Sequence, residues 1–209
     1  MSIKNIVKVW SDKELINENI NFLKQPTKNI FFPISSTTEQ IIKDLIDTYK
    51  SIPCAGIAAN QIGYDKSIFI GLKYLDDNID EEEIERKESN ADQSNIDGNE
   101  YAANYEIYIN PQIDRIDNKS IQEEIEGCLS FPNISLKIKR FDKIKVRYYN
   151  KDGKSIRKTL TGFMSKLFQH ELDHLNGKLM MEHNLIEGYI DEKSDLNPEL
   201  FHELKQKLS

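Results

Sequence analysis

The chain has very little cysteine, with only Cys54 and Cys128 among its 209 residues. Two cysteines do not form the disulfide framework of a small secreted protein, and they fit reduced thiols in the cytoplasm better. Long hydrophobic runs are also missing, since no apolar stretch approaches the roughly 18 residues that span a bilayer. The first ten residues are too polar for a secretory signal and lack the arginine-rich, acid-poor character of a transit peptide. We therefore expect a cytoplasmic protein without a membrane segment.

Positive charge is in deficit, with 28 Lys and Arg against 35 Asp and Glu, so the net charge is -7. Nucleic acid and anionic membranes repel such a chain as a whole, and we predict neither as a direct partner. The shares of hydrophobic and charged residues, 38% and 30%, are typical of a globular protein. This length is enough to build one proper core, so we expect a single domain over residues 1–209.

The pattern of apolar residues predicts a mixture of helices and strands. Strands follow one another without regular βαβ alternation, which favours an α+β fold with mostly antiparallel sheets. Between them, residues 76–104 are rich in acidic side chains and poor in apolar ones, which predicts a solvated or partly disordered insertion. The predicted helices cover residues 12–23, a segment that begins at the N-cap candidates 35–38 and ends before Pro53, residues 163–175, and a segment from Pro198 onward. The predicted strands cover residues 67–75, 105–110, 121–126, 141–149 and 154–160.

The most informative segment is Gln169–His174, which contains the pattern HExxH. Positions i and i+4 share one face of a helix, so the rings of His170 and His174 can reach one metal ion. Glu171 need not bind that ion, and its place beside the first ligand suits proton transfer. The pattern arises by chance in about 1% of chains of this length, which makes a surface helix with two unrelated histidines the weaker alternative.

A catalytic metal site usually has a third protein ligand and one open position. Cys128 is a candidate, because it follows a predicted strand and Gly127 lets the backbone come close to a ligand. The alternative is that Cys128 is a small buried hydrophobic residue, which is common for an isolated cysteine. A further small, apolar segment covers residues 54–63, and its glycines allow another backbone to lie against it.

These three segments, in this order, resemble the peptide deformylase family. The family motifs EGCxS and QHExDHxxG are intact at residues 126–130 and 169–177, and GxGxAAxQ is matched at Gly56, Ala58, Ala59 and Gln61. Cys54 departs from the usual glycine. It would be strained by about 1–2 kcal/mol if the position needs a positive φ, but it would only narrow the substrate cleft if the position must merely be small. Asn60 replaces a common proline or threonine.

The resemblance implies a metal-dependent hydrolase of translation with its HExxH helix at the centre of the fold. Cys128, His170 and His174 would bind one divalent metal, typically Fe²⁺, for which zinc or another ion can substitute. The metal would lower the pKa of a water molecule, and the resulting hydroxide would attack the formyl group of an N-formylmethionyl peptide. Glu171 would take up the proton and pass it to the leaving amine.

The resemblance also assigns the groups that contact the substrate. Gln61 and the backbone N–H of Leu129 would stabilise the oxyanion, and losing one such donor typically costs about 3 kcal/mol. The peptide would pair as a strand with Ala55–Gly56 and with the backbone near Gly127. Phe163 and Leu167 are candidate walls for the methionine side chain, although ordinary core packing explains them equally well.

Two carboxylates, those of Glu126 and Asp173, are candidates for orienting the ligands, with Arg140 as a basic partner. His183 and His202 match no motif, and we expect them to be surface or hydrogen-bonded residues. The expected partner is a formylated nascent peptide, with the ribosome as a candidate meeting place, and the expected state is a monomer. Two alternatives remain open: a zincin-type peptidase that uses the same helix, and a non-catalytic relative whose acidic insertion binds a partner.

Overall fold

The computed structural model describes residues 2–11, 14–73, 98–99, 101–183, 185–190 and 198–208. Most of the predicted acidic insertion, residues 76–97 and 100, lies outside the described residues. The end of that predicted insertion is described, and there Asn99 is buried. Within the described part of the chain, no helix combines the length and the apolar character needed to cross a bilayer.

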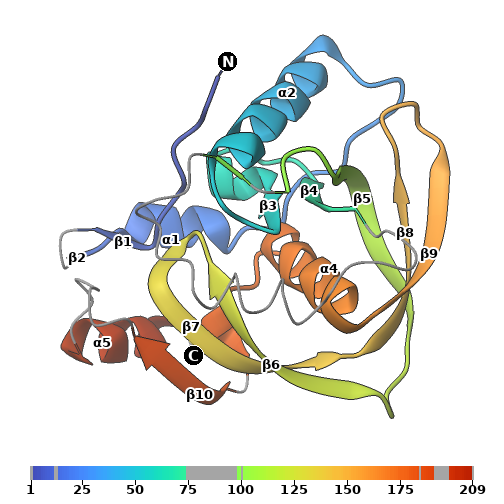
Figure 1. Ribbon diagram of the computed structural model, residues 1–209. Helices are drawn as coiled ribbons and strands as arrows, with labels where there is room; N and C mark the ends of the chain where they lie inside the picture. The colour runs from blue at the N-terminus through green and yellow to red at the C-terminus, as the bar shows by residue number, and fades with distance from the viewer. Residues whose placement is uncertain are drawn as a thin grey trace.

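Two antiparallel sheets form most of the fold, which confirms the α+β prediction (Figure 1). The larger sheet has the order β3-β4-β5-β8-β9 and the smaller one the order β10-β7-β6, while β1 pairs only with β2. The strands are β1 (Trp10–Ser11), β2 (Glu14–Leu15), β3 (Gly56–Ala58), β4 (Ile68–Leu72), β5 (Tyr105–Ile116), β6 (Ile121–Cys128), β7 (Phe131–Phe141), β8 (Lys143–Tyr149), β9 (Ser155–Thr161) and β10 (Leu185–Ile190).

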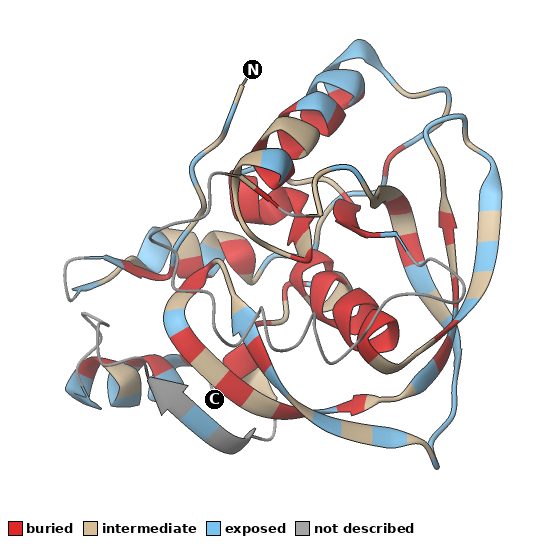
Figure 2. Cartoon of the chain, viewed as in Figure 1, coloured by how far each residue is buried: buried red, intermediate tan, exposed pale blue. Residues whose placement is uncertain are grey.

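The helix that carries HExxH, α4 (Gly162–Leu175), runs through the middle of the molecule and contacts strands of both sheets (Figure 1). Figure 2 shows that α4 is buried along nearly its whole length. The other helical segments are α1 (Asn17–Leu23), α2 (Ser36–Ser51) and α5 (Pro198–Leu208), with short 3₁₀ turns η1 (Ala59–Ile62) and η2 (Met180–Glu182).

Aromatic packing fixes α4 against the larger sheet. Phe168 meets the rings of Phe69 and Tyr108 edge-on, and these two rings stack on each other with centroids 4.3 Å apart. All three side chains are almost fully buried, and each large apolar side chain removed from water contributes about 1.5–3 kcal/mol. Since His174 is 1% exposed and His170 only 9%, the alternative of a surface helix with two unrelated histidines is wrong.

The chain turns directly after α4, where Gly177 has a φ of +71° and ends the helix in a left-handed conformation. The helix predicted over residues 12–23 begins only at Asn17, since Glu14 and Leu15 pair with β1 beside the buried Trp10. The long strand β7 was not predicted, because the expected strands leave residues 127–140 unassigned.

Candidate metal centre and active site

Three side chains from two separate elements converge beside α4. Cys128 is the last residue of β6, at a register shift in the ladder with β7, whereas His170 and His174 lie one turn apart on α4. The Sγ atom of Cys128 is 3.2 Å from Nε2 of His174. One ligand atom from each of the three residues lies within 4.8 Å of the other two. The structure thus brings together the sulfur and the two imidazoles that the sequence motifs suggested.

A buried ion pair orients the first imidazole. Nδ1 of His170 lies 2.9 Å from Oε2 of Glu126, and as the donor of this hydrogen bond it leaves Nε2 for a metal. The guanidinium of Arg140 holds both oxygens of Glu126, at 2.7 Å from Nε and 2.8 Å from Nη2. Both of these charged side chains are only 4% exposed, and each provides the charge that the other needs in a low-dielectric interior.

The charges at this centre suit a divalent cation. Burial raises the pKa of the Cys128 thiol, but the imidazoles of His174 and His170 outweigh burial and bring this pKa to about 5. Burial likewise lowers the pKa of His170, but hydrogen bonds to Cys128 and Glu126 raise it well above its ordinary value. A cation would replace the proton held between the thiolate and the imidazole, and the set of one sulfur and two nitrogens fits zinc or ferrous iron.

The second imidazole is held through its backbone. Asn60 donates a hydrogen bond from Nδ2 to the carbonyl oxygen of His174 at 2.6 Å, which ties η1 to the last turn of α4. Asn60 is one of the positions at which the chain departs from the family pattern, and here its side chain links the first motif to the third. Nδ1 of His174 is buried and has no hydrogen-bond partner among the described residues.

Glu171 is buried on the strand side of the same helix, next to β3. Its Oε1 atom lies 2.6 Å from the point that a Cβ on Gly56 would occupy, so only glycine lets the carboxylate come this close. Leu167, one turn earlier, approaches the same point to 2.9 Å, and it also lies 3.5 Å from the Cβ position of Gly71. Gly56 and Gly71 are cross-strand partners in β3 and β4, so the two glycines together leave space for Leu167 and Glu171.

Gln61 is fixed with its amide nitrogen toward the sulfur. Its Oε1 accepts a hydrogen bond from the backbone N–H of Ala58 at 2.9 Å, which turns Nε2 toward Sγ of Cys128 at 3.5 Å and Oγ of Ser130 at 3.4 Å. Leu129 follows the ligand residue Cys128 directly, in the turn between β6 and β7. The structure therefore places one side-chain donor, Nε2 of Gln61, beside the ligand sulfur.

The predicted substrate-binding backbone divides into two parts. The carbonyl of Ala55 accepts a hydrogen bond from the Leu72 N–H at 2.8 Å and is already used within the sheet. Alternation along an antiparallel ladder directs the backbone groups of Gly56 away from β4, toward the open edge of the sheet. Across the site, a Cβ on Gly127 would meet no atom within 4 Å, so the backbone there faces open space.

Cys54 carries no backbone strain. The described non-glycine residues with a positive φ are Asn110 and Asn133, so Cys54 does not have the left-handed conformation that would penalise a side chain. Its side chain packs beside the core cluster under α2, and its carbonyl accepts a hydrogen bond from Asn99 at 3.0 Å. Of the two possibilities considered from the sequence, the strained cysteine is therefore wrong. Phe163 is 2% exposed and belongs to the core around Phe168.

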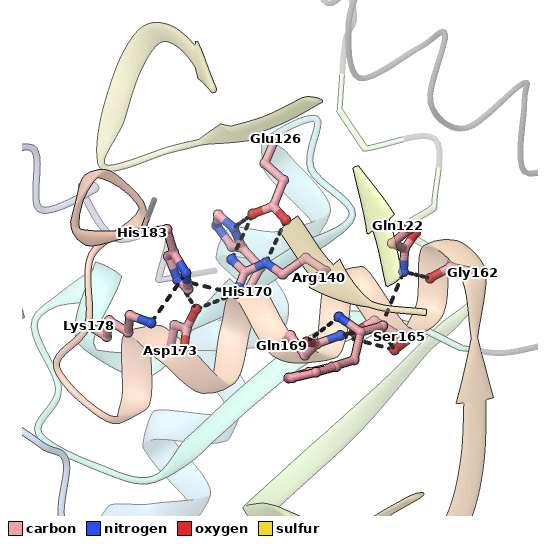
Figure 3. Close-up of polar contacts among 11 residues, drawn as sticks. Gln122, Glu126, Arg140, Gly162, Ser165, Gln169, His170, Asp173, Lys178 and His183 are labelled. Atoms are coloured by element: carbon pink, nitrogen blue, oxygen red, sulfur yellow. Dashed lines mark hydrogen bonds and ion pairs between the residues drawn. The ribbon is translucent and has the colours of Figure 1, made fainter. Parts of the chain in front are cut away.

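Sequence reasoning missed some residues that shape the site. Gln169, although part of a recognised motif, had no expected role, and its side chain bonds the N–H and carbonyl of Phe141 at 3.1 and 2.7 Å (Figure 3). This contact joins α4 to the end of β7, next to Arg140. Asp173 contacts Arg140 as expected, and it also bonds His183, a residue outside every motif.

Comparison with known proteins agrees with this geometry. The family model for polypeptide deformylase matches residues 12–187. A peptide deformylase of Aquifex aeolicus is 34% identical over 155 residues, which cover 74% of this chain and 77% of the relative. A peptide deformylase of Elusimicrobium minutum is 29% identical over 207 residues, covering 99% of this chain and 97% of the relative. The crystal structure of the Thermotoga maritima enzyme is similar with a TM-score of 0.61 at 27% identity, covering 88% of this chain and 98% of that one. The chain therefore belongs to the peptide deformylase family.

Proposed function

We propose that this protein removes the formyl group from the N-terminal formylmethionine of newly made polypeptides. The observation that carries the proposal is the convergence of Cys128, His170 and His174 within 4.8 Å, a ligand set that suits a divalent metal. The proposed metal is Fe²⁺, with zinc or another divalent ion able to replace it. When bound, the ion supplies a Lewis acid that polarises the formyl carbonyl and makes a water molecule more acidic.

In this proposal, Glu171 transfers the proton. Its carboxylate is 3% exposed and lies between α4 and the Gly56 backbone, one residue after the ligand His170. From there it takes a proton from the attacking water and delivers it to the leaving amine, a contribution that is typically worth about 10²–10⁴-fold in rate. The products are formate and a peptide with a free N-terminal methionine.

Two donors stabilise the negative charge that develops on the formyl oxygen. Nε2 of Gln61 is held toward the site by the hydrogen bond that Oε1 accepts from Ala58, so little reorganisation is needed during the reaction. The backbone N–H of Leu129 is the second donor. The peptide lies between the open edge at Gly56 and the backbone at Gly127, and the methionine side chain contacts Leu167, with Phe163 behind it.

The setting of the reaction follows from its substrate. Formylated nascent chains are made in the cytoplasm, so we place the reaction there, on peptides that emerge from the ribosome and with the protein as a monomer.

The test uses the full chain purified anaerobically with Fe²⁺ and a formylmethionyl tripeptide. We expect near-stoichiometric metal and rapid formate release, with a loss of about 10²–10⁴-fold in kcat in Glu171→Ala, which keeps all three ligands. Formate release no faster than in Glu171→Ala would refute the proposal. Casein cleavage without formate would instead indicate a peptidase, and absence of bound metal would indicate a non-catalytic relative.

A further inference from the structure

A chain of polar contacts continues outward from the metal-ligand residue His170, well beyond Glu126 and Arg140. Figure 3 shows His170, Glu126, Arg140, Asp173, His183 and Lys178 beside α4, and each contacts the next. Arg140 uses Nε and Nη2 on Glu126, and its remaining nitrogen, Nη1, donates to Oδ2 of Asp173. The guanidinium is planar and rigid, so a partner on Nη1 also fixes the two bonds to Glu126.

The same oxygen of Asp173 has a second partner. Nε2 of His183 lies 2.7 Å from Oδ2, and the Asp173 side chain is 21% exposed, so without His183 it could turn toward water. Asp173 lies three residues after His170 on the same face of α4. Both His183 and Arg140 thus hold a carboxylate that lies directly beside the ligand helix.

Lys178 determines which nitrogen of His183 carries the proton. Its Nζ lies 3.2 Å from Nδ1 of His183, and an ammonium group can only donate hydrogen bonds. Nδ1 must therefore accept, so Nε2 bears the hydrogen and donates to Asp173. The contact of 3.3 Å between Nη1 of Arg140 and Nε2 of His183 is then a close approach rather than a hydrogen bond.

The backbone brings His183 back to this place. After α4, the left-handed Gly177 packs so tightly on the Lys24 carbonyl that a Cβ would lie only 2.4 Å from it, and the chain reverses there. η2 follows, and the Glu182 carboxylate accepts the Leu179 N–H at 2.6 Å while pairing with Lys24 at 2.9 Å. His183 comes directly after this turn, so the turn also fixes the backbone position from which its ring reaches Asp173.

We propose that His183, oriented by Lys178, is a positioning residue for the metal centre. It fixes Asp173, which fixes Nη1 of Arg140, so that the Arg140–Glu126 pair keeps His170 with Nε2 toward the metal. This inference rests on the metal site of the proposed function but not on its reaction. It is therefore tested by metal binding alone.

The experiment compares His183→Ala, His183→Gln and His202→Ala in the full chain. Each is titrated with Co²⁺ against a chromophoric chelator, and the Co²⁺ d–d bands and the thiolate charge-transfer band are recorded. We expect His183→Ala to bind Co²⁺ about 10–100-fold more weakly and to show shifted d–d bands, because the orientation of His170 is lost. His183→Gln, whose amide can still donate to Asp173, should bind about tenfold more tightly than His183→Ala.

The control histidine, His202, is exposed on α5 and bonds only Gln206 among the described residues, so His202→Ala should match the wild type. Wild-type Co²⁺ affinity and spectrum in His183→Ala would overturn the inference, as would a glutamine variant no better than alanine. If His183→Ala does not fold, Lys178→Met decides in the same way, by weaker or unchanged Co²⁺ binding. Failure of formate release with these metal responses intact would reject the proposed reaction and leave the positioning role standing.

Discussion

At the scale of single residues, the narrowest point of the site is the contact between Gly56 and Glu171. Oε1 of Glu171 stands where a Cβ on residue 56 would have to be, at 2.6 Å, and Leu167 closes the other side at 2.9 Å. The glycine is needed here for close approach, since its φ is not in the left-handed region. The position of the proposed proton carrier therefore depends on the absence of one methyl group on the neighbouring strand.

Gly56→Ala should displace Glu171 while the fold is retained. A displacement of about 1 Å at a reacting group typically costs about 100-fold, so we expect kcat to fall by about that factor with Fe²⁺ still bound. Steady-state formate release, metal analysis and circular dichroism would measure this.

Gly127→Ala is the matched control, because a methyl group there meets no atom within 4 Å. It should fold normally and change KM more than kcat, since only the approaching peptide would contact the new group. Equal kcat in Gly56→Ala and the wild type would contradict the interpretation that a side chain at residue 56 displaces Glu171.

Some residues of the site could be predicted from the sequence and others could not. His170 and His174 could be predicted as a pair because metal chemistry restricts their types and the helix restricts their spacing. Cys128 lies on a strand, and only the motif EGCxS favoured it as the third ligand over a buried apolar residue. His183 could not be predicted, because its role depends on a chain reversal at Gly177 and on the tautomer set by Lys178. Asn60 was visible only as a departure from a motif, and its bond to the carbonyl of His174 needs the tertiary structure.

At the scale of elements, the loop between α2 and β3 is anchored by a residue distant in sequence. Nδ2 of Asn99 donates to the carbonyls of Tyr49 and Cys54, at 2.8 and 3.0 Å, and its Oδ1 accepts the Tyr101 N–H at 2.9 Å. Asn99 is only 6% exposed, so these carbonyls have no easy replacement from water. One side chain therefore joins the end of α2 to the start of the strand that carries Gly56.

Asn99→Ala should destabilise the fold by about 1–3 kcal/mol, the usual cost of leaving buried polar groups unsatisfied. Because it frees the loop before Gly56, KM for the formylated peptide should rise more than kcat falls. Urea unfolding and steady-state kinetics would test both parts. Asn104→Ala, in the same segment but without a side-chain hydrogen bond among the described residues, should behave like the wild type. Equal stability of the two variants would contradict the anchor.

Helices were easier to predict than strands for a physical reason. In α2 and α4, apolar residues recur at helical spacing. The start of α2 is also marked by the N-cap residue Ser35, whose side chain accepts a hydrogen bond from the Thr38 N–H. β7 was not predicted, although its apolar residues alternate at Ile134, Leu136 and Ile138, and Pro132 near its start is unusual within a sheet. The order of the strands in the two sheets depends on contacts between residues far apart in sequence. The sequence therefore predicted the antiparallel direction of the strands but not their order.

At the scale of the whole molecule, Asp44 joins the N-terminal segment and the loop after η1 to α2. Its carboxylate accepts from the hydroxyl of Tyr64 at 2.5 Å and from Gln40 at 2.7 Å, and it pairs with Lys4 at 3.3 Å. Burial alone raises the pKa of Asp44, but these hydrogen bonds and the ammonium group lower it overall. The folded state thus prefers the ionised carboxylate more than the unfolded state does.

Asp44→Asn should lower the free energy of unfolding by about 1–3 kcal/mol near neutral pH, since bonds to a charged group are lost. A lowered pKa in the folded state gives stability that is present above the unfolded value of about 3.9 and lost as the pH falls through the folded value. The difference between wild type and variant should therefore be constant above about pH 5 and shrink below about pH 4. Urea unfolding across pH 3–7 measures this, and a difference that does not shrink in acid would refute it.

The three proposed metal ligands come from both sides of the boundary between the two sheets, which has a consequence for the stability of the protein. The smaller sheet supplies the sulfur and the helix on the larger sheet supplies both imidazoles, with roughly 40 residues of chain between Cys128 and His170. A bound ion would thus link the two sheets. Its ligand atoms would also have to leave one coordination position open for the reaction. The same three side chains would therefore determine both how firmly the ion joins the two sheets and how open the ion is to a substrate.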